Sequence, residues 1–496
     1  MVKRFFTRIL PRRALPVAML LLQVFLLLHM VLTGSPVTQV ANLVLETLSL
    51  LLCIYIVAGT QRGAFKIGWV LLILLVPLFG ITVYFLFNFQ HATRKFRKKV
   101  EESCRTTASG FALVPPSTQP LPLVGDYLRQ QGFPPCPHTQ CRYLSVGEQA
   151  LEAMLEAMEQ ARSYIFLEFF IVEEGKMWNA VLEVLRRKAA QGVEVRLIYD
   201  DLGCFFLLPS DYPKTLTQWG IQCAPFNPFR PTLTTMQNNR DHRKILSVDG
   251  RIAFTGGINL AEYINEVVKF GHWKDTAVRL EGSGAWSLTV MFLQMWQLCI
   301  GETENIAHLF PVQGKEGDVA QPYCDSPLDG DEVGQNVYLS IIHNARRYLY
   351  ITTPYLIVDD NIPEALILAA KRGVDVRIIT PHVWDKRLVH VTTRSYYRQL
   401  IAGGVKVYEY TPGFIHAKMC VSDDTVATVG TVNLDYRSLY LHFECGTCLY
   451  GKAVAAVKAD IENTLELCQR IRAEDCRNSL PARGVQAVLR LFAPLM

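Results

Sequence analysis

Charge is scarce in this sequence, and neither sign dominates. Charged residues make up 19% of the 496 positions, and the formal net charge is +5. The basic residues concentrate at 3–13 and 94–99, and neither block is interleaved with aromatic residues on a predicted folded face. This pattern disfavours a nucleic-acid-binding protein and is typical of the flanks of membrane segments, where basic residues also attract anionic lipids.

A cysteine framework is also missing. The 13 cysteines are odd in number and are scattered over predicted strands, helices and one apolar segment, which excludes a small disulfide scaffold. Cys445 and Cys448 form one C-x-x-C pair without a second pair or a nearby histidine set. Core packing explains this pair better than a zinc or redox site. We therefore expect reduced thiols, which favour a catalytic region in the cytoplasm.

Apolar residues are abundant instead. Half of the residues are hydrophobic, and the mean hydropathy of +0.17 is high for a purely soluble protein. Three apolar segments lie at 15–32, 43–58 and 67–87. Because a helix needs ~20 apolar residues to span a bilayer, the third segment qualifies easily, the first is close and the second is marginal.

The charges around these segments leave two topologies open. Basic residues at 3–13 and 62–66 favour the cytoplasmic side, and the uncharged loop 33–40 favours the outside. Three spans would then place residues 94–99 outside, against the positive-inside rule, whereas two spans satisfy every block. We expect a multi-pass protein of the cell membrane with a cytoplasmic catalytic region.

One motif occurs twice in the remainder of the chain. The stretches that carry it read DHRKILSVDGRIAFTGGINLAEY at 241–263 and FIHAKMCVSDDTVATVGTVNLDYRSLY at 414–440. The residues that share one spacing are His242, Lys244, Asp249 and Asn259 in the first copy, and His416, Lys418, Asp423 and Asn433 in the second. A single copy could arise by chance in a chain of this composition, whereas two copies with identical spacing indicate a site.

The spacing suits the chemistry of a phosphodiester. Successive strand residues alternate between faces, so the histidine and the lysine of each copy project from the same side. When two copies meet, one histidine can attack phosphorus while the other protonates the leaving oxygen. The lysines and the amides of Asn259 and Asn433 can neutralise the phosphate oxygens, so no metal and no cofactor are expected.

The motif copies belong to a longer internal repeat. QGVEVRLI at 191–198 and RGVDVRII at 372–379 each follow a predicted helix and read as equivalent strands. Alternating strands and helices predict an α/β fold with two tandem sandwich halves, related by a pseudo-twofold axis and joined at the active site. The expected segments are a membrane anchor at 1–90, a basic flank and linker at 91–145, a first half at 146–301, a connection at 302–336, a second half at 337–480 and an amphipathic tail at 481–496. Within the linker, residues 108–144 are expected to have little regular structure.

These stretches resemble the phospholipase D superfamily and, within it, the bacterial cardiolipin synthases. The resemblance covers most of the chain, and its motifs are FNP (226–228), NRDHRK (239–244), WKD (273–275), TPYLI (353–357), YTPGFIH (410–416) and NLDYRS (433–438). It implies two phospholipase D-like halves and phosphatidyl transfer between two phosphatidylglycerol molecules. The products would be cardiolipin and glycerol, formed through a covalent phosphohistidine in contact with anionic membrane lipid.

Roles follow from the resemblance and from charge. The analogy with relatives favours His242 as nucleophile and His416 as general acid and base. The motif residues Asp249 and Asp423 are counted with the catalytic set, although their place at the end of the motif fits a structural role equally well. Asp275 and Glu444 are candidates to orient the histidines, as an imidazole that moves protons usually needs a carboxylate.

One residue departs from the family pattern, which often has asparagine two residues before the glutamate of the second motif. His442 occupies this position. We expect it to be a satisfied residue at the rim of the site rather than a third histidine in it.

Residue chemistry alone supports phosphodiester exchange through a covalent histidine. A phospholipase D-type hydrolase and a phosphatidylserine synthase, which differ only in the acceptor, therefore remain alternatives. The apolar segments and the lack of a basic aromatic groove disfavour a nuclease with the same motif. The two intact motifs disfavour a non-enzymatic membrane scaffold.

Overall fold

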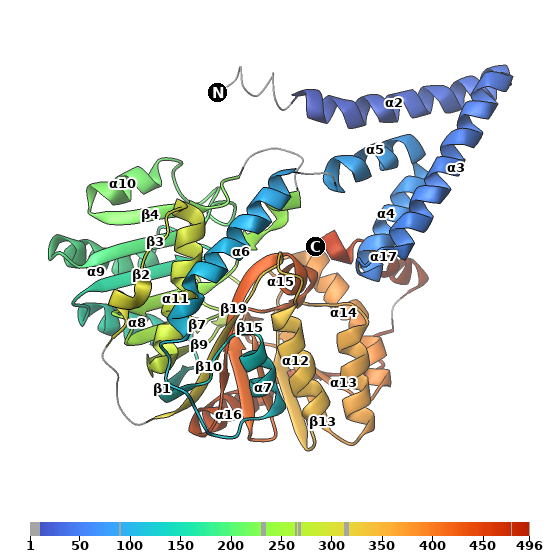
Figure 1. Ribbon diagram of the computed structural model, residues 1–496. Coiled ribbons are helices and arrows are strands. Elements are labelled where there is room, and N and C mark those ends of the chain that lie inside the picture. The colour runs from blue at the N-terminus through green and yellow to red at the C-terminus, as the bar shows by residue number, and fades with distance from the viewer. Residues whose placement is uncertain are drawn as a thin grey trace. The chain divides into compact units, whose positions relative to one another are not determined.

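The computed structural model describes residues 10–88, 91–229, 235–262, 265, 269–311, 317–477 and 479–495 (Figure 1). The chain divides into two compact units. One consists of Met1–Phe96, Arg230–Asn238 and Ala487–Met496, and the other of Arg97–Phe229 and Asn239–Gln486. The first unit contains the apolar helices, and the second, the catalytic unit, contains both motif copies.

Four helices form from the apolar segments: α2 (Leu10–Thr33), α3 (Pro36–Ala58), α4 (Gly63–Leu75) and α5 (Pro77–Asn88). Among the described residues, only α3 is both long and apolar enough to cross a bilayer, with Ala18–Thr33 and Gly63–Leu75 as shorter apolar helices. The ranking of the segments given above was therefore wrong. The segment judged marginal is the strongest candidate, and the one judged clearly long enough is broken.

Pro77 causes the break, because proline has no N–H to donate and its ring clashes with the preceding turn. The exposed start of α5 is compensated by Gln23 of α2, whose Oε1 accepts the backbone N–H of Leu78 at 2.9 Å. Helix α4 returns to α5 closely enough that a Cβ on Gly80 would lie 2.7 Å from Ile73 Cα. These contacts pack the broken segment against its neighbours.

The catalytic unit is built on one continuous sheet. From one edge to the centre, the strands are β4 (Ile221–Phe226), β3 (Glu194–Asp200), β2 (Tyr164–Phe169), β6 (Lys244–Val248), β7 (Ile252–Gly256), β9 (Ala277–Gly282) and β1 (Cys136–Leu144). From the centre outward follow β10 (Asp318–Asp325), β19 (His442–Leu449), β17 (Val426–Gly430), β16 (Met419–Ser422), β11 (Tyr348–Thr352), β13 (Asp375–Pro381), β14 (Lys406–Tyr410) and β20 (Cys468–Ile471). The order of strands therefore repeats outward from the central β1–β10 pair, and the predicted two-half α/β architecture is confirmed.

Helices cover this sheet (Figure 1). In chain order they are α6 (His91–Phe111), α7 (Leu123–Gln130), α8 (Gly147–Glu159), α9 (Lys176–Ala190), α10 (Tyr212–Gln218), α11 (Ser283–Ile300), α12 (Val333–Asn344), α13 (Asn361–Lys371), α14 (Arg387–Ala402), α15 (Tyr436–Tyr440) and α16 (Lys452–Glu466). A last helix, α17 (Leu480–Leu491), follows them in the chain and has no buried residues. Strand β2, which pairs in parallel with β3 and antiparallel with β6, is buried along its whole length, as expected for a strand covered on both faces. Helix α9 buries Trp178, Val181 and Leu185, whose spacing places them on one face.

Two regions expected to be a linker and a connection between the halves contribute the centre of the sheet. Residues 91–145 contain α6, α7 and β1, and residues 302–336 contain β10. Strands β1 and β10 pair antiparallel and join the two halves. Pro137 and Pro322 lie inside these strands, and proline within a short run argues against a strand when only sequence is read.

Candidate active site

Two short strand pairings cross from one half to the other next to the motif histidines. Strand β5 (Arg240–Asp241) pairs in parallel with β19, and β15 (Gly413–Ile415) pairs in parallel with β8 (His272–Lys274). The backbone N–H of His242 donates to Phe443 O at 2.9 Å, and that of His416 donates to Lys274 O at 2.7 Å. Each motif histidine is therefore held beside a strand of the opposite half.

This pairing gives each histidine a carboxylate from the other half. His242 Nδ1 lies 2.9 Å from both Oε1 and Oε2 of Glu444. His416 Nδ1 lies 2.6 Å from Asp275 Oδ2. All four side chains are buried. Since Nδ1 is engaged in both rings, Nε2 is the atom left for reaction.

The two carboxylates are fixed by different neighbours. Glu444 also accepts hydrogen bonds from the Ser438 hydroxyl at 2.5 Å and from the hydroxyl of Thr431. Asp275 accepts the backbone N–H of Thr276 at 2.9 Å. At the position of the first copy that matches Thr431, a Cβ on Gly257 would lie 2.0 Å from Asp275 Oδ1. Glycine is thus required beside Asp275, whereas a threonine supports Glu444.

Both motif lysines are buried within the cluster. Lys244 Nζ donates to His242 O at 2.6 Å, and Lys418 Nζ donates to His416 O. Burial lowers the pKa of Lys244 to about 8 and that of Lys418 to about 7. The charge of Lys244 also lowers the pKa of Lys418, because two like charges in one buried cluster repel each other.

The histidines differ in their electrostatic surroundings. Burial and the charge of Lys244 hold the pKa of His242 well below its ordinary value, and burial and Lys418 lower the pKa of His416 to about 4. Burial raises the pKa of Glu444 to about 8. Burial would also raise the pKa of Asp275, but His416 and Lys418 outweigh it and the pKa lies below its ordinary value. The Asp275 carboxylate therefore favours a protonated partner more strongly.

The motif asparagines lie next to the same cluster. Asn259 Oδ1 accepts the backbone N–H of Ile171 at 3.3 Å. Asn433 donates its own backbone N–H to Ser438 Oγ, which in turn bonds to Glu444. Among the residues that the structure describes, Asn433 Oδ1 has no hydrogen-bond partner.

The motif aspartates do not join this cluster. Asp249 accepts the backbone N–H groups of residues 162, 163 and 164, and Asp423 accepts those of 346, 347 and 348. Both aspartates have a positive φ, 52° and 56°, and each follows the far end of its motif strand, ~15 Å from the lysine end at the rise of a strand. Their carboxylates accept hydrogen bonds from the backbone donors that begin the neighbouring strand, which favours the structural role of both residues over a catalytic one.

Aromatic rings enclose the two histidines. The His242 ring lies 4.9 Å from Phe170 and 5.6 Å from His442, and the His416 ring lies 5.3 Å from Trp273. His442 was expected to be a satisfied rim residue, and this was wrong: it is buried, and neither ring nitrogen has a hydrogen-bond partner among the described residues. The signal was present in the sequence, because His442 precedes Glu444 by the same two residues that separate Trp273 from Asp275.

Three of these side chains also meet the distance requirement for a metal ion. The ligand atoms of His242, His442 and Glu444 lie within 4.8 Å of one another. However, burial and the charges of Arg437, Lys244 and Arg240 hold the pKa of His442 well below its ordinary value. Burial disfavours any charge at His442, but the three positive side chains also repel a dication and attract an anion such as a phosphodiester.

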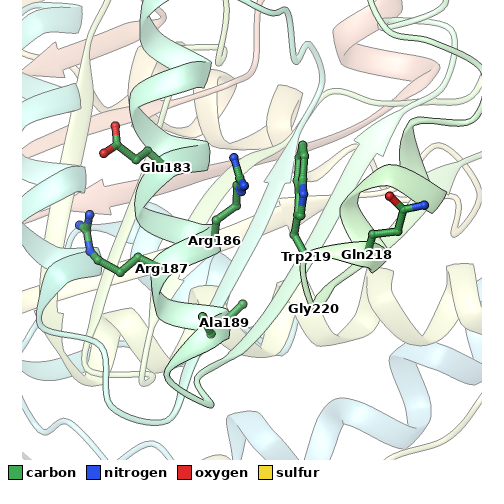
Figure 2. A pocket seen from close by; sticks show the side chains of 8 residues that line it. Glu183, Arg186, Arg187, Ala189, Gln218, Trp219 and Gly220 are labelled. Atoms are coloured by element: carbon green, nitrogen blue, oxygen red, sulfur yellow. The ribbon is translucent and has the colours of Figure 1, made fainter.

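A separate open pocket lies at the other edge of the sheet (Figure 2). It is lined by α9 and by residues 218–220, which lead into the start of β4. Arg186 stacks on Trp219 there, with its guanidinium carbon 4.3 Å from the ring centre. The pocket therefore lies at the N-terminal ends of the parallel strands. The histidines lie at the edge formed by the C-terminal ends of these strands, because Phe169 at the end of β2 pairs with Lys244 at the start of β6.

Family models match both parts of the chain. The model described as "Cardiolipin synthase, PLD-like domain" matches residues 154–265 and 338–465, which contain the two motif copies. A cardiolipin synthase of Halalkalibacterium halodurans is 33% identical over 86% of this chain and 88% of its own length. The chain belongs to the cardiolipin synthase family of the phospholipase D superfamily. The model "Phospholipase_D-nuclease N-terminal" matches residues 47–87, so members of this family share the apolar region as well, and the protein is membrane-associated.

Other relatives are consistent with this family. A cardiolipin synthase 2 of Bacillus cereus is 36% identical over 72% of this chain and 71% of its own length. An uncharacterised protein of Streptococcus mutans is 41% identical over 89% of this chain and 99% of its own length. The crystal structure of a phosphatidylserine synthase from Haemophilus influenzae superposes with a TM-score of 0.55 at 14% identity, over 75% of this chain and 98% of that one. That likeness concerns the fold of the two halves.

Proposed function

We propose that the chain transfers a phosphatidyl group from one phosphatidylglycerol to a second, which yields cardiolipin and glycerol. The family supplies the substrate class, and the paired histidines supply the chemistry. The observation that carries the proposal is the crossed arrangement of His242 with Glu444 and His416 with Asp275. Two oriented imidazoles beside two buried lysines form a site that can both attack and protonate around one phosphorus.

In the first step, His242 Nε2 attacks phosphorus, a P–N bond forms and the P–O bond to glycerol breaks. The proton of His416 passes to the departing glycerol oxygen. Two observations support this assignment: burial and the charge of Lys244 keep His242 neutral, with a pKa well below its ordinary value, while ionised Asp275 counteracts the lowering of the His416 pKa that burial causes. Lys244, Lys418 and the amides of Asn259 and Asn433 neutralise the phosphate oxygens.

In the second step, the glycerol hydroxyl of another phosphatidylglycerol enters. His416, now neutral, takes the hydroxyl proton, the new P–O bond forms, and the bond to His242 Nε2 breaks. Protons and charges balance over the two steps, and neither step requires a metal ion or an external oxidant. In its ionised form Glu444 accepts the proton on His242 Nδ1, so that Nε2 remains the reacting atom.

We also propose that more than one apolar segment anchors the chain in the cell membrane and that the catalytic unit faces the cytoplasm. The basic blocks at 3–13 and 94–99 support this orientation. All 13 cysteines are free thiols, as expected in a reducing compartment. A fluorescent protein that matures only in the cytoplasm, fused after residue 496, should be bright, and a periplasmic reporter fused there should be inactive.

The deciding experiment uses the purified full-length protein in detergent micelles with phosphatidylglycerol as the only lipid. Products are followed by mass. Cardiolipin and free glycerol should form with the parent protein and be absent with His242→Ala and with His416→Ala. Phosphatidic acid and glycerol without cardiolipin would place the protein among the hydrolases instead.

A further inference from the structure

Exposed apolar side chains gather at the edge of the sheet where the histidines lie. Phe205 and Phe206, in the loop after β3, are 45% and 92% exposed, and Trp384 and Leu388, after β13, are 49% and 61% exposed. Strands β3 and β13 occupy equivalent positions in the two halves, since they pair in parallel with β2 and β11. We name these four residues the apolar rim. It is present on both halves of the catalytic unit.

The rim loop of the first half packs against the surroundings of His242. A Cβ on Gly203 would lie 2.4 Å from Phe170 O, and Cys204 Sγ accepts the backbone N–H of Val172 at 3.2 Å. The Phe170 ring in turn lies against His242. The loop that carries Phe205 and Phe206 therefore contacts Phe170, and Phe170 contacts His242, the proposed nucleophile.

The loop after β13, which carries Trp384, is likewise connected to His416 through packed side chains. Tyr355 donates its hydroxyl to Asp385 Oδ2 at 2.5 Å, and its ring lies 6.3 Å from Phe414, which neighbours His416. The charge of His416 also contributes to lowering the pKa of Asp385, although burial opposes the shift and Lys386 acts more strongly. Trp384 is thus adjacent in sequence to Asp385, whose pKa depends in part on the charge of His416.

Charged neighbours distinguish a lipid surface from a protein partner. Lys386 and Arg387, both exposed, lie between Trp384 and Leu388. Asp385 lies between Trp384 and these residues and pairs with Lys386 at 3.0 Å, so Arg387 gives this loop its net positive charge. An exposed tryptophan close to a basic side chain is typical of segments at the level of anionic lipid head groups. An exposed phenylalanine pair on the other loop provides apolar area for the same interface.

We propose that the apolar rim inserts into the lipid interface and holds the catalytic edge of the sheet against an anionic bilayer. This inference rests on the proposed function, because a buried histidine can reach a membrane phosphodiester only from the edge at which it lies. Insertion on both sides of the histidines would place the head-group layer, with its phosphodiesters, directly over Nε2. Docking then sets which lipids enter the site, while the histidines and lysines carry out the chemistry.

The first test compares two substrates with the full-length protein. Phosphatidylglycerol in vesicles requires docking, whereas dihexanoyl-phosphatidylglycerol dissolved as monomers does not. The variant Phe206→Ser/Trp384→Ser should raise the apparent KM for vesicle lipid about tenfold or more and leave turnover of the monomer within about twofold. Phe206→Leu/Trp384→Phe, which keeps the apolar character, should restore the vesicle reaction.

A matched control uses an exposed leucine away from the edge. Leu368 is 51% exposed near the end of α13, which leads to the start of β13. Leu368→Ser should leave both reactions unchanged. Equal losses on vesicles and monomers in the rim variant, or no loss on either, would overturn the proposal.

The second test reads docking without any turnover. The fluorescence of Trp384 is obtained as the difference between the parent protein and Trp384→Phe. In vesicles of phosphatidylglycerol brominated near the head groups, this difference signal should be quenched. If the parent protein converts neither substrate, the proposed function fails, and this quenching still decides the docking proposal. Unquenched Trp384 fluorescence in these vesicles would overturn it.

Discussion

At the scale of single residues, the two histidines have different partners although their motifs are alike. Asp275 sits against Gly257, and Glu444 is held by Thr431 and Ser438. The pKa of Asp275 lies below its ordinary value, so this carboxylate is ionised, whereas burial raises the pKa of Glu444. This difference separates a nucleophile from an acid in a site that is otherwise symmetric.

The assignment predicts where the covalent intermediate forms. With a phosphodiester that has a nitrophenol leaving group, no general acid is needed, so His416→Ala should still accumulate a phosphoramidate on His242. With phosphatidylglycerol, the same variant should lose about 10²–10⁴-fold in rate. Mass spectrometry of the peptide that contains residue 242 measures the adduct. An adduct on His416 in the His242→Ala variant would reverse the two roles.

Lysine charge predicts the dependence on pH. Free-enzyme pKa values of about 7 for Lys418 and about 8 for Lys244 are below the ordinary lysine value, so phosphate-binding charge is lost as pH rises through this window. Because kcat/KM reports the free enzyme, it should decline as His416 loses its proton near its pKa of about 4 and should fall more steeply above about pH 7, where the lysine charge is lost as well. Lys418→Arg should move the fall to about pH 8, because arginine stays charged, whereas Lys452→Arg on the surface should not. A profile that is flat to pH 10 would contradict the role of the lysines.

The motif aspartates predict a loss of stability rather than of chemistry. Asp249→Ala removes an acceptor from three backbone N–H groups and should lower the free energy of unfolding by about 3 kcal/mol. Denaturant titration measures the change, and the rate per folded molecule should stay within about threefold. A folded variant with normal stability and no turnover would show that Asp249 takes part in the reaction.

The sequence predicted the residues of the site better than their partners. The repeated spacing singled out His242, Lys244 and their second-half equivalents without any structure. That His242 would meet Glu444 of the other half could not be predicted, because spacing along a strand carries no information on pairing across a sheet. His442 was misjudged for the same reason.

At the scale of elements, the short β15–β8 pair positions His416. Backbones approach there so closely that a Cβ on Gly413 would lie 2.3 Å from His272 N. Gly413→Ala should therefore separate the strands, move His416 from Asp275 and reduce kcat by about 100-fold, as a shift of 1 Å in a catalytic group can do. Gly484→Ala on α17, where nothing lies within 4 Å, is the matched control and should be neutral. Unchanged kcat in Gly413→Ala would show that this pairing does not position the site.

The same scale explains which elements were predicted. Apolar runs such as Tyr164–Phe169 read as buried strands and are buried strands. Strands β1 and β10 were missed because each contains a proline and each lies at the centre of the sheet, where pairing on both sides overrides weak local preference. Hydropathy treats residues 67–87 as one long apolar segment. Pro77 divides this segment into two helices, neither of which is long enough to span a bilayer.

At the scale of the whole molecule, the two halves form one compact unit that contains the sheet and both crossed pairings. We expect this unit to unfold in one cooperative step. Peptides from β2 and from β11 should lose hydrogen-exchange protection at the same denaturant concentration, and Asp249→Ala should move both transitions equally. Transitions that separate, with only the first half moved, would show that the halves are independently stable.

The crossed carboxylates have a consequence for the ancestry of the repeat. A lone copy of this unit would hold a histidine without its carboxylate and a carboxylate without its histidine. Before the gene duplicated, such a unit could complete either pair only by self-association about a twofold axis. Fusion of the two copies then freed each to diverge, and the exchange of aspartate for glutamate and of glycine for threonine records that division of labour.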